Sequence, residues 1–264
     1  MAKVRLDTLL AQRGLFPSRA RAAASVMAGE VRLGTAGDRA AKPGQMVAGD
    51  VVVSLDEVQR FVSRGGTKLE NALTALGLDV AGRRCLDVGA STGGFTDCLL
   101  QRGATHVIAL DVAYGELAWS LREDARVTVM ERSNARRLTA GELDYAPDLV
   151  VADLSFISLT KVLPAVLATC APGYDALAMV KPQFEVGRER VGRGGVVRDP
   201  ALRRAAVLSV ATFVRDACAA AVMGFAPSGL PGPKGNLETF VHVAEAGRDG
   251  ELEDLEAALD EAGA

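Results

Sequence analysis

Short apolar runs alternate with amphipathic segments along most of the chain, starting near Cys85. Such runs predict strands joined by helices, because buried parallel strands read as nearly continuous hydrophobic stretches. The predicted strands are residues 85–90, 107–112, 127–131, 149–153 and 176–181, and the predicted helices between them are residues 95–101, 116–122 and 159–171. Right-handed crossovers between these strands give an α/β fold with a doubly wound, mostly parallel sheet.

A long helix and two more strands follow this alternating region. Asp199 is placed to cap the helix, and Pro200 occupies its first position, where a missing N–H costs nothing. Residues 221–226 and 239–244 are apolar, and the Pro- and Gly-rich connection between them predicts an antiparallel hairpin. The sheet is therefore expected to have seven strands, followed by an acidic tail, residues 247–264, that forms a surface helix or is partly disordered.

The beginning of the chain differs in pattern and in charge. Helical periodicity covers residues 5–10, Ser18 can cap a second helix, and short strands joined by turns follow up to residue 53. Ten Lys and Arg against six Asp and Glu give residues 1–67 a net charge of +4, which leaves −7 for the rest of a chain whose total is −3. A basic module attached to a larger acidic one predicts contact with a polyanion, although any single cation here could equally be solvated.

The stretch that runs from Asp87 to Phe95 contains a glycine-rich turn between the first predicted strand of the sheet and the next helix. Glycines let backbone N–H groups approach a ligand closely. The spacing Gly89-x-x-x-Gly93-Gly94 is not that of a dinucleotide fingerprint. The acidic Asp87 disfavours a pyrophosphate and favours a ligand with an amine, such as S-adenosylmethionine. A turn without a ligand is the alternative.

Two later positions extend this candidate cofactor site. Asp111 ends the second strand of the sheet, where a carboxylate can accept hydrogen bonds from ribose hydroxyls, although an acid here could instead cap the next turn. Asn134, after the third strand, could read an adenine, although asparagine is also a common turn residue.

Four charged residues stand at the edges of elements around the same predicted cleft. Asp153 and Lys181 end two strands, Glu238 precedes the last strand, and Lys68 begins a helix that Thr67 is expected to cap. Lysines held by carboxylates beside a methyl donor can deprotonate and orient a ribose hydroxyl. Each residue alone is better explained as a surface charge or an ion pair, so the catalytic hypothesis depends on the set of four.

Several motifs carry a resemblance to known families. The N-terminal motifs R-L-D, S-R-x-x-A, G-x-V-x-L and P-G-x-x-V, in this order, resemble the S4 RNA-binding domain. The set Lys68, Asp153, Lys181 and Glu238 matches the K-D-K-E tetrad of the FtsJ-like ribose 2′-O-methyltransferases. Together the motifs resemble the TlyA (haemolysin A) family over about residues 3–245.

The resemblance implies a class I, Rossmann-like, S-adenosylmethionine-dependent methyltransferase preceded by a small α+β S4 domain. It implies 2′-O-methylation of a cytidine in the RNA of a ribosomal subunit, with Lys68, Asp153, Lys181 and Glu238 as catalytic residues. The expected domains are 1–58 (S4-like), 59–66 (linker), 67–246 (methyltransferase) and 247–264 (tail). The expected cofactor-binding residues are Asp87, Gly89, Ala90, Ser91, Thr92, Gly93, Gly94, Phe95, Asp111, Val112, Asn134 and Asp153. The expected RNA-binding residues are Arg5, Arg19, Arg21, Arg32, Lys42 and Arg64.

One departure from the family pattern concerns the linker. Members that act on both ribosomal subunits carry an R-x-W-V element, whereas this chain has Phe61 where the tryptophan is expected, with different spacing. The linker's role in cofactor affinity and dual-subunit activity is therefore not carried over. The short stretch before the S4 motif favours the single-subunit type.

Other function classes find little support in the sequence. Leu154 and Ser155 replace the paired prolines of base N-methyltransferases, and the four cysteines have no C-x-x-C pair and no placement suited to a covalent nucleophile or a metal site. They are expected to be reduced core thiols. Neither a signal peptide nor a long apolar run is present, so we expect a cytoplasmic protein without membrane insertion. The alternatives are a membrane-lytic haemolysin and a non-catalytic ribosomal RNA chaperone.

Overall fold

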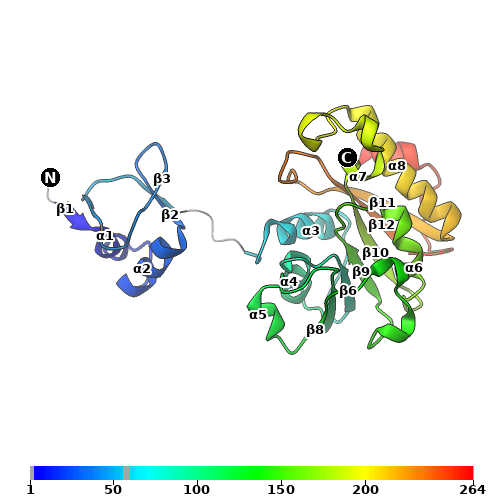
Figure 1. The fold of residues 1–264 in the computed structure, drawn as a ribbon, viewed down its shortest axis with the longest axis horizontal. Helices are drawn as coiled ribbons and strands as arrows, with labels where there is room; N and C mark the ends of the chain where they lie inside the picture. The colour runs from blue at the N-terminus through cyan, green and yellow to red at the C-terminus, as the bar shows by residue number, and fades with distance from the viewer. Residues whose placement is uncertain (1–2, 56–59, 264) are drawn as a thin grey trace. The chain divides into compact units, whose positions relative to one another are not determined.

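The chain divides into two compact units, Met1–Gln59 and Arg60–Ala264, in a computed structural model that describes residues 3–55 and 60–263. Gln59, the first residue of the predicted linker, lies outside the described residues. In Figure 1 the first unit runs from dark blue to light blue, and the second from cyan to red.

The first unit packs two helices against short antiparallel strands. Ser18 caps the second helix as predicted, its side chain accepting a hydrogen bond from the N–H of Arg21 at 3.2 Å. Leu6, Leu10, Val26 and Val31 form the centre of a small core. The elements are β1 (Lys3–Arg5), α1 (Leu6–Gln12), α2 (Arg19–Ala28), β2 (Val31–Leu33), β3 (Asp38–Arg39), β4 (Met46–Ala48) and β5 (Val53–Leu55). Strand β1 pairs with β4, and β2 lies between β3 and β5.

The second unit is built on a seven-stranded sheet of order β11-β12-β10-β9-β6-β7-β8. Its strands are β6 (Arg84–Val88), β7 (His106–Leu110), β8 (Val127–Met130), β9 (Leu149–Ala152), β10 (Asp175–Val180), β11 (Ala220–Pro227) and β12 (Thr239–Glu245). Only β12 runs antiparallel to its two neighbours, because the β11–β12 hairpin returns the chain between β11 and β10. The predicted mostly parallel sheet with an antiparallel C-terminal hairpin is confirmed.

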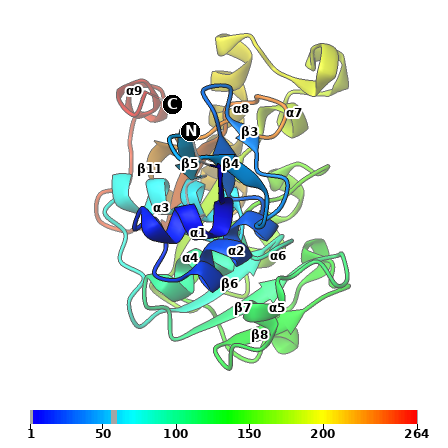
Figure 2. The same cartoon turned by 90° about the vertical axis from the view of Figure 1, so that its left-hand side faces the viewer.

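Helices cover both faces of this sheet, which gives three layers (Figure 1). The helices are α3 (Arg64–Ala75), α4 (Gly94–Gln101), α5 (Trp119–Arg122), α6 (Leu163–Leu167), α7 (Pro182–Glu185), α8 (Pro200–Ala217) and α9 (Leu255–Glu261). One hydrophobic core lies under α3, α4 and α5, and the other lies under α6, α8 and α9. Figures 1 and 2 both show α9, in red, near β11 at one end of the sheet, and α5 near β8 at the other.

Several boundaries differ from the predicted ones. Helix α8 begins after the capping Asp199 as expected, whereas the helix predicted over residues 159–171 is a 3₁₀ turn, Leu159–Lys161, followed by the short α6. Helix α5 has one turn instead of covering residues 116–122. The acidic tail contributes α9, whose Leu255 and Leu259 are buried in the core. Within residues 3–55 and 60–263, no helix has the length and hydrophobicity needed to span a membrane.

The largest difference concerns the start of α3. The prediction that Thr67 caps this helix is wrong, because the helix begins at Arg64 after Ser63. Gly65 and Gly66 therefore do not break the helix. A Cβ on Gly66 would overlap the ring of Phe61, and one on Gly94, at the start of α4, would overlap the hydroxyl of Ser63. These glycines are needed for the close approach of the two helix starts.

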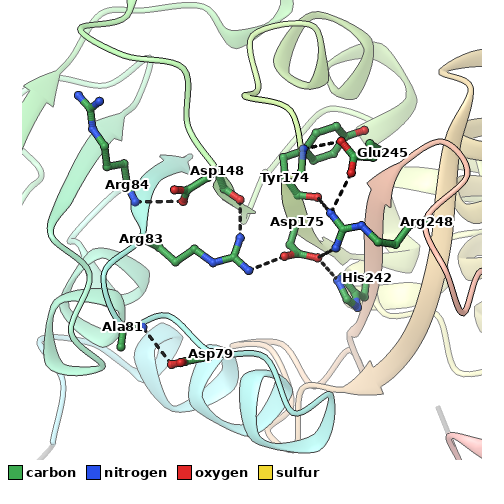
Figure 3. A network of polar contacts seen from close by, with 11 residues as sticks. Asp79, Ala81, Arg83, Arg84, Asp148, Tyr174, Asp175, His242, Glu245 and Arg248 are labelled. Carbon is green, nitrogen blue, oxygen red and sulfur yellow. Dashed lines mark hydrogen bonds and ion pairs between the residues drawn. The ribbon is translucent and has the colours of Figure 1, made fainter.

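A buried carboxylate holds the amino-terminal edge of the sheet together (Figure 3). Asp175, at the start of β10, is 4% exposed and accepts a hydrogen bond from Arg83 at 2.6 Å. His242 Nε2 lies 3.0 Å and Arg248 Nη1 3.4 Å from its other oxygen. Burial raises the pKa of Asp175, but the hydrogen bonds and charges of His242 and Arg83 outweigh it, so the pKa lies below its ordinary value. This network joins residues next to β6, β10 and β12.

We predict that Asp175→Asn lowers the free energy of unfolding at pH 7 by about 2–4 kcal/mol, because Arg83 and Arg248 lose their ion pairs with this buried carboxylate. Since the pKa of Asp175 is lower in the folded state, its stabilisation is full above the unfolded pKa of about 4 and is lost at lower pH. Urea unfolding at several pH values measures both effects. Asp79→Asn is the matched control, because Asp79 is exposed and accepts a hydrogen bond from the backbone N–H of Ala81 at 3.0 Å (Figure 3).

Candidate functional site

The candidate site lies where β6, β7, β9 and β10 end, at the carboxyl edge of the parallel strands, where open α/β sheets bind ligands. The chain leaves β6 in a turn pressed against the end of β9. Gly89 has φ +88°, and a Cβ there would lie 2.5 Å from the carbonyl oxygen of Asp153. Gly93 has φ +95°, and its Cβ would overlap Leu121. Both positions therefore require glycine.

Asp87 lies beneath this turn and is fully buried. Its Oδ2 accepts hydrogen bonds from the N–H and the hydroxyl of Thr96, at 2.9 and 2.7 Å. Its Oδ1 has no hydrogen-bond partner among the described residues. Burial raises the pKa of Asp87 to about 7, and the negative charges of Asp153 and Asp111 add to this, against the Thr96 hydrogen bonds. A buried carboxylate oxygen without a partner fits a site that receives a cationic group.

A cavity of about 410 Å³ opens beside the turn. Of the predicted cofactor residues it is lined by Gly89, Ser91, Asp111, Val112, Asn134 and Asp153. The others do not line it, and Phe95 lies in the core, where its ring packs 5.8 Å from that of Phe240. Half of the predicted cofactor residues therefore line one cavity. Asp87 and the remaining residues of the glycine turn do not line it.

Two of the lining residues also have structural roles. Asp111 accepts hydrogen bonds from the N–H groups of Ser91 and Ala113, both at 2.8 Å, and so holds the glycine turn against the end of β7. Asn134 accepts from the N–H of Arg136 at 3.1 Å and caps the 3₁₀ turn Ala135–Arg137. The turn role considered for Asn134 is therefore present, together with its position on the cavity wall.

The predicted tetrad forms two ion pairs. Lys68, in the second turn of α3, pairs with Glu238, and both are buried, with side chains 8% and 2% exposed. Lys181 pairs with Asp153 and donates a hydrogen bond to the hydroxyl of Ser155 at 3.1 Å. Lys181 and Glu238 line a second cavity of about 320 Å³. They lie close because Val180 is the register partner of Thr239 in the β10–β12 pair. The predicted convergence of these side chains is thus present in the structure.

The two cavities share Ser155 and Phe156. Phe156 is 92% exposed and has φ +65°, a conformation that L-residues rarely adopt. Its ring lies 5.3 Å from that of Phe184, which lines the second cavity. Phe156 was not predicted as a site residue, although it directly follows the Leu154-Ser155 dipeptide that argued against base N-methylation.

Glu185, in α7, holds the segment that follows Phe156 in place. It accepts hydrogen bonds from the Ser158 hydroxyl at 2.6 Å and from the N–H of Leu159 at 2.9 Å. Burial raises the pKa of Glu185 above its ordinary value, against both hydrogen bonds. The residue was not predicted, because no local pattern signals a carboxylate that acts on a distant turn.

The predicted RNA-binding residues are placed differently from one another. Arg5 and Arg19 both pair with the buried Asp7, at 2.7 and 3.2 Å, and hold the pKa of that carboxyl well below its usual range. Arg21 and Lys42 are exposed. The other two contact backbone carbonyls: Arg32 donates to Gly37 at 3.3 Å, and Arg64, in the second unit, donates to Pro231 at 2.6 Å.

For Asp87→Asn we predict a stability difference from wild type that depends on pH. The raised pKa means that folding opposes ionisation of Asp87, so wild type loses stability as pH rises from about 4 to about 7. The variant lacks this loss, so its free energy of unfolding should rise relative to wild type by about 2–4 kcal/mol between pH 4 and pH 8. Chemical unfolding over this range measures it, and a difference that is constant with pH contradicts the account.

For the Lys68–Glu238 pair we predict strong non-additivity. Lys68→Met leaves Glu238 buried without its cation and should cost about 3–5 kcal/mol of stability. The double variant Lys68→Met/Glu238→Leu removes both charges and should recover most of that loss. Urea unfolding of the two single variants and the double variant gives the coupling, and additive effects contradict a buried, mutually neutralising pair.

The comparisons with known proteins agree with this geometry. Residues 61–244 match the FtsJ-like methyltransferase family. The Mycobacterium tuberculosis protein TlyA, named as a 16S/23S rRNA (cytidine-2′-O)-methyltransferase, is 52% identical over 241 residues, which cover 90% of this chain and 89% of that protein. Hemolysin A of Brachyspira hyodysenteriae is 35% identical over 240 residues, covering 90% and 99%.

A solved structure of a proposed hemolysin from Streptococcus thermophilus superposes with a TM-score of 0.74 at 38% identity, covering 100% of this chain and 96% of that one. The family expected from the sequence motifs is confirmed. The chain belongs to the FtsJ-like methyltransferase family, within the group that includes TlyA and Hemolysin A.

Proposed function

We propose that this chain transfers a methyl group from S-adenosylmethionine to the ribose 2′-hydroxyl of a cytidine in ribosomal RNA. The observation that carries the proposal is the position of Lys181. It is held by Asp153, which lines the first cavity, and by Ser155, which lines both, while its own side chain lines the second. One amine thus stands where a methyl donor in the first cavity and a hydroxyl in the second would meet.

The residues around the first cavity fit S-adenosylmethionine. The partnerless oxygen of Asp87 and the nearby carboxylates suit the positive charges of the cofactor, Asp111 lies at the end of β7 where ribose hydroxyls are bound in related sheets, and the cradle at Gly89 leaves no room for a Cβ. When bound, the cofactor supplies a methyl group on a sulfonium, which an oxygen nucleophile accepts while the carbon–sulfur bond breaks.

The tetrad supplies the proton chemistry. Lys181 in its deprotonated form can accept the proton of the 2′-hydroxyl as the oxygen attacks the methyl group, and the Asp153 carboxylate stabilises the ammonium that forms. Glu238 lies on the same cavity and is kept in place by Lys68, so the hydroxyl is oriented between Lys181 and Glu238. Burial of the second pair excludes water from that side and strengthens these interactions.

The second cavity suits a nucleoside drawn out of an RNA strand. RNA-modifying proteins stack splayed bases on aromatic side chains, and Phe156 and Phe184 offer two rings at this cavity. The loop that supplies Val191 and Gly195 to its wall also carries exposed arginines, and Lys234, beside Gly195, lines the same cavity. The arginines are Arg188, Arg190, Arg193 and Arg198. Cations around the opening would bind the phosphates on either side of the target nucleotide.

The first unit is proposed to dock the enzyme on ribosomal RNA, as its S4-like motifs imply. Arg21 and Lys42 are exposed and would contact phosphates directly. Arg5 and Arg19 share the charge of Asp7, so their contribution to the potential is smaller and their main effect is on the shape of this surface.

Lys181→Met tests the proposed reaction. Loss of the only proposed proton acceptor should lower methyl transfer at least a hundredfold, as removal of a general base commonly does, with folding and cofactor affinity largely kept. The measurement is transfer of labelled methyl groups to each ribosomal subunit, with 2′-O-methyl sites mapped by reverse transcription. Lys161→Met, at an exposed lysine in the turn before α6, is the matched control. Transfer by Lys181→Met at the wild-type rate would contradict the mechanism.

A further inference from the structure

One polar group in the second cavity has no task in the mechanism above. Gln183, in α7, lines this cavity, and its Oε1 is buried without a hydrogen-bond partner among the described residues. A buried acceptor without a partner costs about 1–3 kcal/mol, so such groups are rare unless a ligand supplies the missing donor. A second amide on this cavity, Asn236, has a partner for both polar atoms, since it accepts from the N–H of Val197 at 2.9 Å and donates to the carbonyl of Gly195 at 2.8 Å.

The position of Gln183 is fixed by its neighbours along the chain. Lys181 is held by its ion pair, Pro182 is buried at the first position of α7, and Phe184 faces Phe156. Along the chain, Gln183 therefore lies between the group proposed to contact the ribose and the ring proposed to stack on the base. With the ribose at Lys181 and the base on Phe184, the edge of the base is the part of the nucleoside proposed to reach this amide.

We propose that Gln183 is a specificity-determining residue that reads the exocyclic amino group of the target cytosine. The inference rests on the proposed function, since it requires a pyrimidine nucleoside in the second cavity. Cytosine offers an N4 amino group as donor, whereas uracil has the O4 acceptor in the same place. A buried carbonyl oxygen accepts a hydrogen bond from the first and repels the second. The site thereby rejects uridine through the unpaired acceptors it would leave buried.

The amide could also be turned by a half rotation, which would present its NH2 group to the base. Two substitutions of similar size separate these arrangements. Gln183→Glu keeps acceptor oxygens and has no donor when ionised, and Gln183→Leu has neither. If Gln183 acts as an acceptor, the glutamate variant should keep the preference for cytidine and the leucine variant should lose it.

The experiment uses the full-length chain with S-adenosylmethionine and ribosomal subunits that carry either cytidine or uridine at the methylated position. The ratio of kcat/KM for cytidine to that for uridine is compared between wild type and variants. Gln183→Leu should lower this ratio about tenfold or more, chiefly through slower methylation of cytidine, as expected for the loss of one hydrogen bond to a base edge. Gln183→Glu should keep the preference for cytidine. Gln101→Leu, which removes an exposed amide on α4, should leave the ratio unchanged.

An unchanged ratio in Gln183→Leu, with folding confirmed by thermal unfolding, overturns the proposal, because the amide then does not distinguish the two bases. Loss of the preference in Gln183→Glu overturns it as well, since the amide would then act as a donor. Failure of the wild-type chain to methylate either substrate is a different result and counts against the proposed function itself.

Discussion

The site depends on the close approach of the turn after β6 to the residue that follows β9. At Gly89 the backbone passes so close to the carbonyl of Asp153 that no side chain fits. This contact brings the buried Asp87, at the end of β6, and Asp153, after β9, to the same edge of the sheet, with Asp111 joining from the next strand. A larger residue would push the two strand ends apart and separate the two cavities that share Ser155 and Phe156.

Gathering three carboxylates at one edge has an electrostatic cost that the fold handles in different ways. Asp153 has Lys181 as its partner, and Asp111 accepts two backbone N–H groups. Among the described residues, Asp87 has Thr96 as its one hydrogen-bond partner, and burial and its acidic neighbours raise its pKa to about 7. The negative charge of Asp87 lowers the stability of the fold without a ligand, and a cationic ligand would relieve this destabilisation when it binds. Part of the lost folding stability would thereby return as ligand affinity. The Asp175 network at the opposite edge has cations in place and contributes stability instead.

The parts of this arrangement that follow from strand order could be predicted from the sequence. Lys181 and Asp153 end apolar runs, and parallel strands end at one edge, so their convergence needed no knowledge of packing. Close packing could not be read in the same way. The glycines at 65 and 66 were interpreted as a linker because glycine usually weakens a helix, whereas here both lie inside α3 and Gly66 allows Phe61 to lie against that helix. Phe95 was assigned to the cofactor from its place in the motif, but its ring belongs to the core.

Contacts between distant segments were equally hidden. Arg5 and Arg19 carry the charge expected of an RNA-binding surface, yet both contact Asp7. The Arg5 contact is local, whereas the Arg19 contact depends on how α1 and α2 pack. Local sequence gives the sign of a charge, whereas the fold determines which partner shares it. The effective potential of this surface is therefore weaker around Asp7 than the count of basic residues indicates.

The loop from Asp153 to Ser158 determines how the two cavities are aligned. Its first residue is tied to Lys181, its last to Glu185, and Phe156 stands between them in a left-handed conformation. Both anchors come from the same short segment, β10 into α7, which also carries Gln183. A shift of this segment would move the proposed proton acceptor, the base-reading amide and the aromatic ring together. Alignment of a methyl donor with a hydroxyl is sensitive to displacements of about 1 Å. Because one segment carries all three side chains, the group proposed to accept the proton and the groups proposed to bind the base keep their positions relative to one another.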